Sequence, residues 1–168
     1  LGAEMLALAA AATSREAAHV LMRDAISSGR ALLKLEEIVS AQGGDKAVVR
    51  EPSRLPKAPH RSSFDAKREG VVESVDPRAI GYGIIALGGG RRNMEDELDP
   101  SVGFVITAKP GHHVTKGQTL ATIHARSRED LDLGRSTLER AIVIGDSALP
   151  PLPLVSHRVT ARGVETLA

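Results

Sequence analysis

The chain of 168 residues is long enough for one ordinary domain, or for a small domain joined to part of another. Its net charge of +1 gives no electrostatic reason to expect nucleic acid or an anionic membrane as a partner, and the absence of cysteine excludes disulfides and thiolate chemistry. Hydrophobic residues make up 42% of the chain but aromatic residues only 2%, so the core must be built mainly from Ala, Leu, Ile and Val.

The first residues read as helix. Residues 1–12 form an Ala-rich apolar stretch that Glu4 interrupts and no basic segment precedes. This pattern favours a buried helix cut from a longer protein over a signal peptide, and the stretch is too short to span a bilayer. Thr13 to Glu16 has the spacing of a capping box, which predicts the start of the next helix.

Two glycine positions divide the rest of this helical region. Gly29 predicts a break, after which residues 30–42 resume with an apolar stripe at helical spacing. Gly43-Gly44 is typical of a helix C-terminal cap. Prolines 52, 56 and 59 then predict an extended connector, because proline fixes φ and lacks an amide donor. The predicted organisation is therefore residues 1–50 helical, 51–60 linker and 61–168 a second domain.

The second domain mixes short strands with helices. Asp76-Pro77 predicts a helix start with proline at its first position, and Gly88-Gly89-Gly90 predicts the end of that helix. Turn signals and apolar patterns place strands at residues 70–75, 102–107, 119–124 and 155–160, and a second helix at residues 127–146.

Lys109 to Ala125 carries a repeated skeleton of Gly, Val, Gly, Leu and Ile at three-residue intervals. It describes a glycine-turned strand pair such as barrel-sandwich domains contain, including lipoyl and biotinyl carriers. A carrier needs a modified lysine at an exposed hairpin tip soon after the last strand. Arg126-Ser127-Arg128 stands there and offers none. The fold class expected is α+β, with a barrel-sandwich-like second domain, and a carrier or binding module is the alternative function.

The loop Gly88, Gly89, Gly90, Arg91, Arg92 is the main candidate for a binding role. Three glycines expose backbone amides, and two arginines could pair with an anion. The pattern of a P-loop is absent, so a simple glycine stop with solvated arginines is the competing interpretation. The acidic run at residues 95–99 is expected to be a solvated loop, partly salt-paired with these arginines.

No metal site is predicted, because the six histidines lack the spacing of zinc ligands and the acidic run lacks the spacing of an EF-hand. His112 and His113 are adjacent and are expected to lie in a turn. Serine-nucleophile motifs are absent as well.

In their order, the motifs resemble the pyrimidine-nucleoside phosphorylase family over essentially the full length of the chain. Residues 1–6 look like a late helix of the family's catalytic domain, followed by its helix breaks and by the linker at Leu55-Pro56. The matching stretches are residues 28–31, 41–45, 70–76, 78–81, 86–91, 99–103 and 109–125. A related phosphorylase acting on nucleotides, such as an AMP phosphorylase, is a weaker match.

The resemblance implies an enzyme, a pentosyltransferase that cleaves a pyrimidine nucleoside such as thymidine with inorganic phosphate to give free base and a pentose 1-phosphate. The family's phosphate and base sites, a Lys-His-Ser…Gly-Gly-x-Gly-Asp stretch and an Arg, a Ser and a Lys, lie upstream in its order and have no counterpart here. No catalytic or substrate-binding residue is therefore assigned, and this chain alone is expected to be inactive. The resemblance implies a cytoplasmic homodimer without cofactor, in which Gly88 to Arg92 matches a mobile loop near the active-site mouth.

Overall fold

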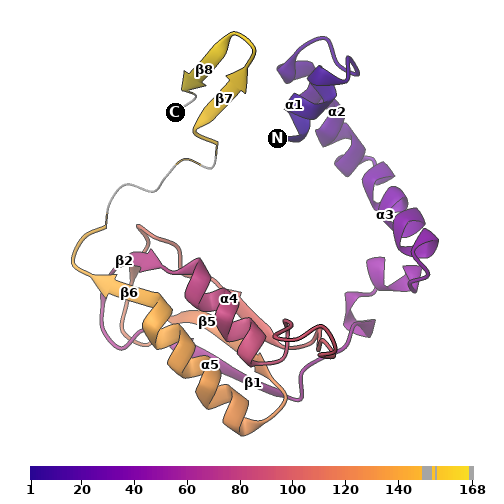
Figure 1. Cartoon of the computed structure of the whole chain (residues 1–168). Helices are drawn as coiled ribbons and strands as arrows, with labels where there is room; N and C mark the ends of the chain where they lie inside the picture. Colours follow the sequence, from indigo (N-terminus) through magenta and orange to yellow (C-terminus); the bar gives the residue numbers. More distant parts are fainter. Residues whose placement is uncertain (149–152, 154, 167–168) are drawn as a thin grey trace. The chain divides into compact units, whose positions relative to one another are not determined.

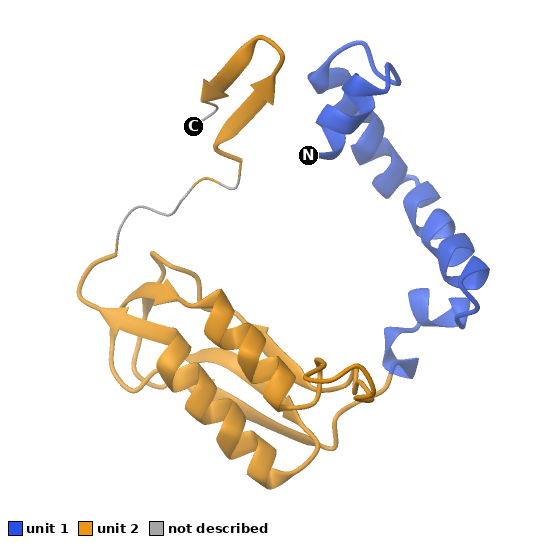
Figure 2. Cartoon of the chain, viewed as in Figure 1, with its two compact units in different colours: residues 1–55 blue, residues 56–168 orange. Residues whose placement is uncertain are grey.

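The computed structural model describes residues 1–148, 153 and 155–166. The chain forms two compact units, Leu1–Leu55 and Pro56–Ala168 (Figure 2). The division falls within residues 51–60, where the prolines predict a connector. Which domains of a whole enzyme the two units represent stays a prediction.

Unit 1 contains α1 (Gly2–Leu8), α2 (Arg15–Ser27) and α3 (Arg30–Ala41), which confirms the helical prediction (Figure 1). The predicted cap of α2 was wrong by one residue. Ser14, not Thr13, is the N-cap: its backbone is extended and its hydroxyl accepts the amide of Ala17 at 3.1 Å. The same turn holds the pKa of Glu16 below its ordinary value, chiefly through a backbone hydrogen bond.

Glycine ends the helices of unit 1 as predicted. Gly29 takes φ 78° between α2 and α3, a left-handed backbone that side chains disfavour. At the end of α3 the amide of Gly43 donates to the carbonyl of Ser40, and that of Gly44 donates to Val39. This pair of bonds is the Schellman motif, in which Gly43 supplies the left-handed residue with φ 79°.

The apolar stripe of unit 1 is exposed. The buried hydrophobic side chains of the three helices are Ala3 in α1 and Ala18 in α2, and α3 has none. The exposed large apolar residues of α2 and α3 are Val20, Leu21, Met22, Ile26, Leu32, Leu33, Leu35 and Ile38. A face of this kind is typical of a surface that packs against further protein.

The connector is less extended than the prolines predict. It contains one short 3₁₀ turn, η2 (Pro52–Arg54), and another, η1 (Lys46–Val49), directly precedes it. Asp45 starts η1 by accepting the amide of Ala47 at 2.9 Å. Pro52 is compatible with η2 because the first position of a helical turn needs no amide donor.

Unit 2 holds two three-stranded antiparallel sheets, and the α+β class is confirmed. One sheet has the order β1 (His60–Asp65), β5 (Thr119–Ala125), β3 (Gly103–Ile106); the other has the order β4 (His113–Val114), β2 (Gly70–Val75), β6 (Ile142–Gly145). Both sheets contribute to one core, in which Phe64, Val72, Leu120, Ile123, Leu138 and Ile142 are buried.

The glycine-turned segment between β3 and β5 folds as its skeleton predicts. Gly111 and Gly117 have φ 87° and 85°. Each lies third in a turn closed by a backbone hydrogen bond, His112 to Lys109 in the first and Gln118 to Thr115 in the second. The first turn precedes β4 and the second precedes β5. Residues of this one short segment therefore form a strand in each of the two sheets.

In this part of unit 2, β1, β4 and β6 were not predicted as strands, and one helix was predicted too long. The helix α5 (Arg128–Ala141) ends where β6 begins, so the predicted helix 127–146 is wrong over its last residues. Those residues, Ile142 to Gly145, pair with β2, a partner about seventy positions earlier in the chain. β1 and β4 were missed: β1 is mostly polar, and β4 has only two residues.

The helix α4 (Pro77–Ala86) begins as predicted. Asp76 is its N-cap and accepts the amides of Arg78 and Ala79 at 2.8 and 3.2 Å. Figure 1 shows α4 and α5 side by side over the sheet of β1, β5 and β3, and contacts join α4 to α5 and β3, and α5 to β5 and β1.

Glycine allows this close approach of helices and sheet. A Cβ on Gly83 of α4 would lie 2.4 Å from Cγ2 of the buried Thr137 of α5 and 3.2 Å from the Phe104 ring of β3. A Cβ on Gly134 of α5 would lie 2.6 Å from Cγ2 of Ile123 in β5. Both glycines are buried, so each leaves room for a neighbouring side chain.

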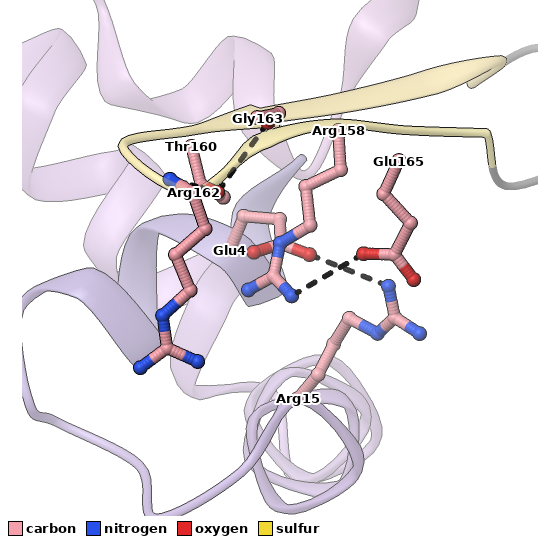
Figure 3. Close-up of polar contacts among 7 residues, drawn as sticks. All are labelled: Glu4, Arg15, Arg158, Thr160, Arg162, Gly163 and Glu165. Carbon is pink, nitrogen blue, oxygen red and sulfur yellow. Dashed lines mark hydrogen bonds and ion pairs between the residues drawn. The ribbon is translucent and has the colours of Figure 1, made fainter.

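The last described residues form a hairpin of β7 (His157–Thr160) and β8 (Gly163–Thr166) (Figure 3). The predicted strand 155–160 is therefore shorter than expected and has a partner that was not predicted. Thr160 shapes the turn by accepting the amide of Arg162 at 3.2 Å, and Arg158 lies 4.0 Å from Glu165 across the strands. Figure 3 also shows the ion pair of Arg15 and Glu4 at 3.4 Å, within unit 1.

We predict that Gly83→Ala lowers the free energy of unfolding of unit 2 by about 1–3 kcal/mol, because the new methyl group has no room beside Thr137. The matched control is Gly81→Ala on the same helix, where no atom lies within 4 Å of the added Cβ. Alanine should stabilise the helix there by about 0.5–1 kcal/mol. Urea denaturation measures both, and a Gly83→Ala variant as stable as Gly81→Ala would contradict the packing described.

Candidate functional site

The candidate loop starts at a buried anchor. Leu87, at the end of α4, is fully buried, and glycines follow it directly. Gly88 takes φ 92° and its amide donates to Ile85, while the amide of Gly89 donates to Ile84. This is a second Schellman motif, so the predicted glycine stop to the helix is confirmed.

The base of the loop is held from two sides. The carbonyl of Gly88 accepts the amide of Asp99 at 3.0 Å, which closes residues 88–99 into one loop. On the other side the guanidinium of Arg126 lies against Gly88: a Cβ there would be 2.9 Å from its central carbon and from both terminal nitrogens. Arg126 also lies 3.7 Å from Asp130 of α5. Nothing in the sequence indicated that Arg126 contacts the loop, because it is 38 positions away from Gly88.

Asp96 organises the tip of the loop. One of its carboxylate oxygens accepts the amides of both Arg92 and Asn93, at 2.8 and 2.9 Å. These two backbone bonds hold the pKa of Asp96 below its ordinary value. The carboxylate therefore acts as a cap for its own turn.

The predicted salt-pairing of the acidic run with the arginines was wrong in its donors. Asp96 takes backbone amides, and in the described ranges neither Arg91 nor Arg92 forms a side-chain ion pair with the run. Both arginines are exposed. The loop thus presents arginine side chains that form no ion pair with its carboxylates among the described residues, although the charge of Arg92 makes a small contribution to lowering the pKa of Asp96.

Asp99 closes the far end of the loop. Its carboxylate accepts the hydroxyl of Ser101 at 2.6 Å and the amide of Ser101 at 2.9 Å. These bonds, in that order of effect, with a smaller contribution from the Arg126 charge, hold the pKa of Asp99 below its ordinary value. The predicted turn at Asp99-Pro100 is confirmed as this side-chain-capped turn.

A shallow cavity of about 410 Å³ lies where the loop rejoins the sheet. Its lining runs from residues 100–105, across His124 of β5 and Arg61 of β1, to residues 56–58. Arg61 and Lys57 carried no signal in the sequence, because neither belongs to a motif; only the pairing of β1 with β5 places Arg61 beside His124.

The histidines lie on different elements of the fold. His112 and His113 lie at the turn before β4 and in β4 itself, whereas His60 and His124 belong to β1 and β5. Across the residues that the structure describes, no group of three or more His, Cys, Asp or Glu is placed to hold a metal ion.

The carrier alternative is not favoured by the local structure. Ser127 is the N-cap of α5 and accepts the amide of Asp130 at 3.0 Å. Residues 126–128 therefore form a strand-to-helix junction, where a swinging-arm carrier would need an exposed hairpin tip with a lysine.

The strands and helices around the loop match a known protein family. Residues 71–145 match the family described as pyrimidine nucleoside phosphorylase C-terminal domain. This range includes β2, α4, the glycine loop, β3, β4, β5, α5 and β6. Over these residues the chain contains a pyrimidine nucleoside phosphorylase C-terminal domain.

Individual relatives extend the likeness beyond that range. The pyrimidine-nucleoside phosphorylase of Staphylococcus epidermidis is 40% identical over 133 residues, which is 79% of this chain and 31% of the relative. The protein of that name from Staphylococcus aureus is 38% identical over 151 residues, 90% of this chain and 35% of the relative. The chain thus spans about a third of the length of the curated relatives that it matches.

Among the described residues, no helix is both long enough and apolar enough to cross a bilayer.

We predict that the glycine loop opens in acid. The folded loop depresses the pKa of Asp96 and Asp99 below their ordinary value of 3.8, so its stabilisation is complete above that value. It is lost as pH falls through the still lower folded values. The amide resonances of Arg92, Asn93 and Ser101 should therefore shift with midpoints below 3.8 in an NMR titration.

The control for this titration is Asp96→Asn, which cannot ionise. It should remove the acid transition at Arg92 and Asn93 and leave that at Ser101. Amides of Arg92 and Asn93 that do not move between neutral and acid pH in the unmodified chain would contradict the hydrogen bonds to Asp96.

Proposed function

We propose that this chain is the C-terminal part of a pyrimidine-nucleoside phosphorylase, an enzyme that cleaves a pyrimidine nucleoside with inorganic phosphate to give base and pentose 1-phosphate. The observation that carries the proposal is the domain match over residues 71–145, extended by relatives that are 38–40% identical over most of the chain. Inorganic phosphate would be a co-substrate, and no cofactor would be needed.

The chemistry needs groups that this chain does not bring together. Phosphate must be bound by cations and amide donors, and the departing base must be stabilised as negative charge develops on it. The family stretches that the resemblance associates with these tasks have no counterpart in the 168 residues. We therefore place the catalytic residues of the whole enzyme outside this chain.

The exposed face of unit 1 supports the same proposal. The helices α2 and α3 carry eight large exposed apolar side chains between Val20 and Ile38. Such a face gains free energy when it is covered, at roughly 25 cal/mol for each Å² removed from water. We propose that the remainder of the same polypeptide covers it in the whole enzyme.

The direct test is an activity assay of this chain by itself. With thymidine or uridine and phosphate, we expect no free base above the uncatalysed background when the reaction is followed by ultraviolet absorbance. A full-length relative is the positive control. Phosphorolysis by the 168-residue chain would show that the catalytic residues lie within it and would overturn the proposal.

The glycine loop has a proposed role in the whole enzyme. Its base is fixed by Asp99 and Arg126, whereas Arg91 and Arg92 are exposed and form no ion pair with the acidic run in the described ranges. Closure of a loop over bound substrate excludes water and positions the reacting groups. We propose that this loop helps to close the cleft over the nucleoside and that its arginines contact the substrates in the closed state.

In a full-length enzyme that contains this chain, Arg91→Ala and Arg92→Ala should each raise KM or lower kcat, reducing kcat/KM about tenfold, because a charge-assisted contact is lost. The control is Arg78→Ala, an exposed arginine of α4 outside the loop, which should change neither constant. Steady-state kinetics with thymidine and uridine measure the effect. Unchanged constants for both loop variants would rule the role out.

Several finer statements stay predictions of the family resemblance. They are a preference for thymidine, a homodimeric whole enzyme and a cytoplasmic location.

A further inference from the structure

The cavity beside the glycine loop lies on the face of the β1-β5-β3 sheet that is turned away from α4 and α5. Ile123 and Phe104 face those helices, since they are the side chains that meet Gly134 and Gly83. Successive side chains of a strand point to opposite faces, so Gly103, Val105 and His124 face the other way. The lining includes these three residues.

Strand register brings a row of polar positions across this face. His124 of β5 is paired with Arg61 of β1 on one side and with Gly103 of β3 on the other. Side chains directly opposite in an antiparallel pair have Cβ atoms about 4.5–5.5 Å apart. Gly103, with φ 141°, brings no side chain, and a Cβ built on it would meet no atom within 4 Å. The hollow therefore opens beside His124 and Arg61.

The titratable residues of the lining are all basic. They are Lys57, Arg61 and His124, and the lining contains no carboxylate. Across the described part of the chain, none of the three has a side-chain hydrogen bond or ion pair with another residue. The nearest carboxylate in sequence to the lining, Asp99, already binds Ser101 through two hydrogen bonds.

The remaining lining is largely apolar. Pro56, Pro100, Val102 and Val105 provide it. A volume of about 410 Å³ is within the range of small-molecule sites, so the cationic row and the apolar walls can contact one compact ligand. An arginine fork and a lysine beside it match the several oxygens of a phosphate better than a single carboxylate, because phosphate presents three acceptors.

We propose that this cavity binds a small phosphomonoester, with the phosphate held by Arg61, Lys57 and His124 and the organic part against Val102 and the flanking prolines. This inference does not depend on the proposed function, because binding to the chain itself is the property claimed.

The test is isothermal titration calorimetry of the 168-residue chain with phenyl phosphate. Inorganic phosphate and phenol are titrated separately, so that the contribution of each half of the ligand is measured. Phenyl phosphate should bind saturably and at least about tenfold more tightly than either, since both halves of the site are then occupied.

The variants are Lys57→Gln and Arg61→Gln, alone and combined. The combined variant should weaken phenyl phosphate binding at least about tenfold, because two charge-assisted contacts are lost. The matched control combines Lys116→Gln and Arg78→Gln, which remove the same charge from exposed positions outside the cavity. Circular dichroism and thermal unfolding check that every variant is folded.

Equal affinities for phenyl phosphate in the two double variants would overturn the proposal, because the effect would then be one of net charge. Absence of saturable binding to the unmodified chain would overturn it too. Inorganic phosphate binding as tightly as phenyl phosphate would contradict the part of the proposal that gives the apolar walls a role. None of these outcomes bears on the proposal that the chain is an inactive C-terminal part, which the activity assay tests separately.

Discussion

The close approach of α4 and α5 to the sheet of β1, β5 and β3 is the constraint on which unit 2 depends. Gly83 and Gly134 permit it, because any side chain at these two positions would collide with Thr137 or Ile123. Dense packing of this kind leaves little freedom for the end of α4. Leu87 is therefore buried at a fixed point, and the glycine loop starts from it.

The loop shows how acidic residues can organise a cationic surface without neutralising it. The carboxylates of Asp96 and Asp99 accept hydrogen bonds from nearby amides and from the Ser101 hydroxyl. Arg91 and Arg92 stay exposed. The same holds for the cavity next to the loop, where Arg61 and Lys57 face a lining without carboxylates. Both places keep positive charge available to an anionic ligand, although the net charge of the chain is only +1.

Most helix starts and turns could be predicted from the sequence because they depend on residues close together in the chain. Features that depend on pairing between distant segments could not be predicted. Asp76-Pro77 and the glycines at 43, 88, 111 and 117 act within a few residues, so their roles could be predicted. The strand β6 could not, because Ile142 and Val143 continue the apolar spacing of α5 and only pairing with β2 makes them a strand. For the same reason Arg126 and Arg61 were missed: each acts through a neighbour distant in the chain.

Native-state hydrogen exchange tests the central packing claim most directly. If the glycine contacts join α4 and α5 to the sheet as one unit, the slowest amides of α4, α5 and β5 should exchange with the same free energy of opening, equal to that of global unfolding of unit 2. Opening of α4 at a distinctly lower free energy than α5 and β5 would contradict the account, because the loop would then start from a helix that moves independently.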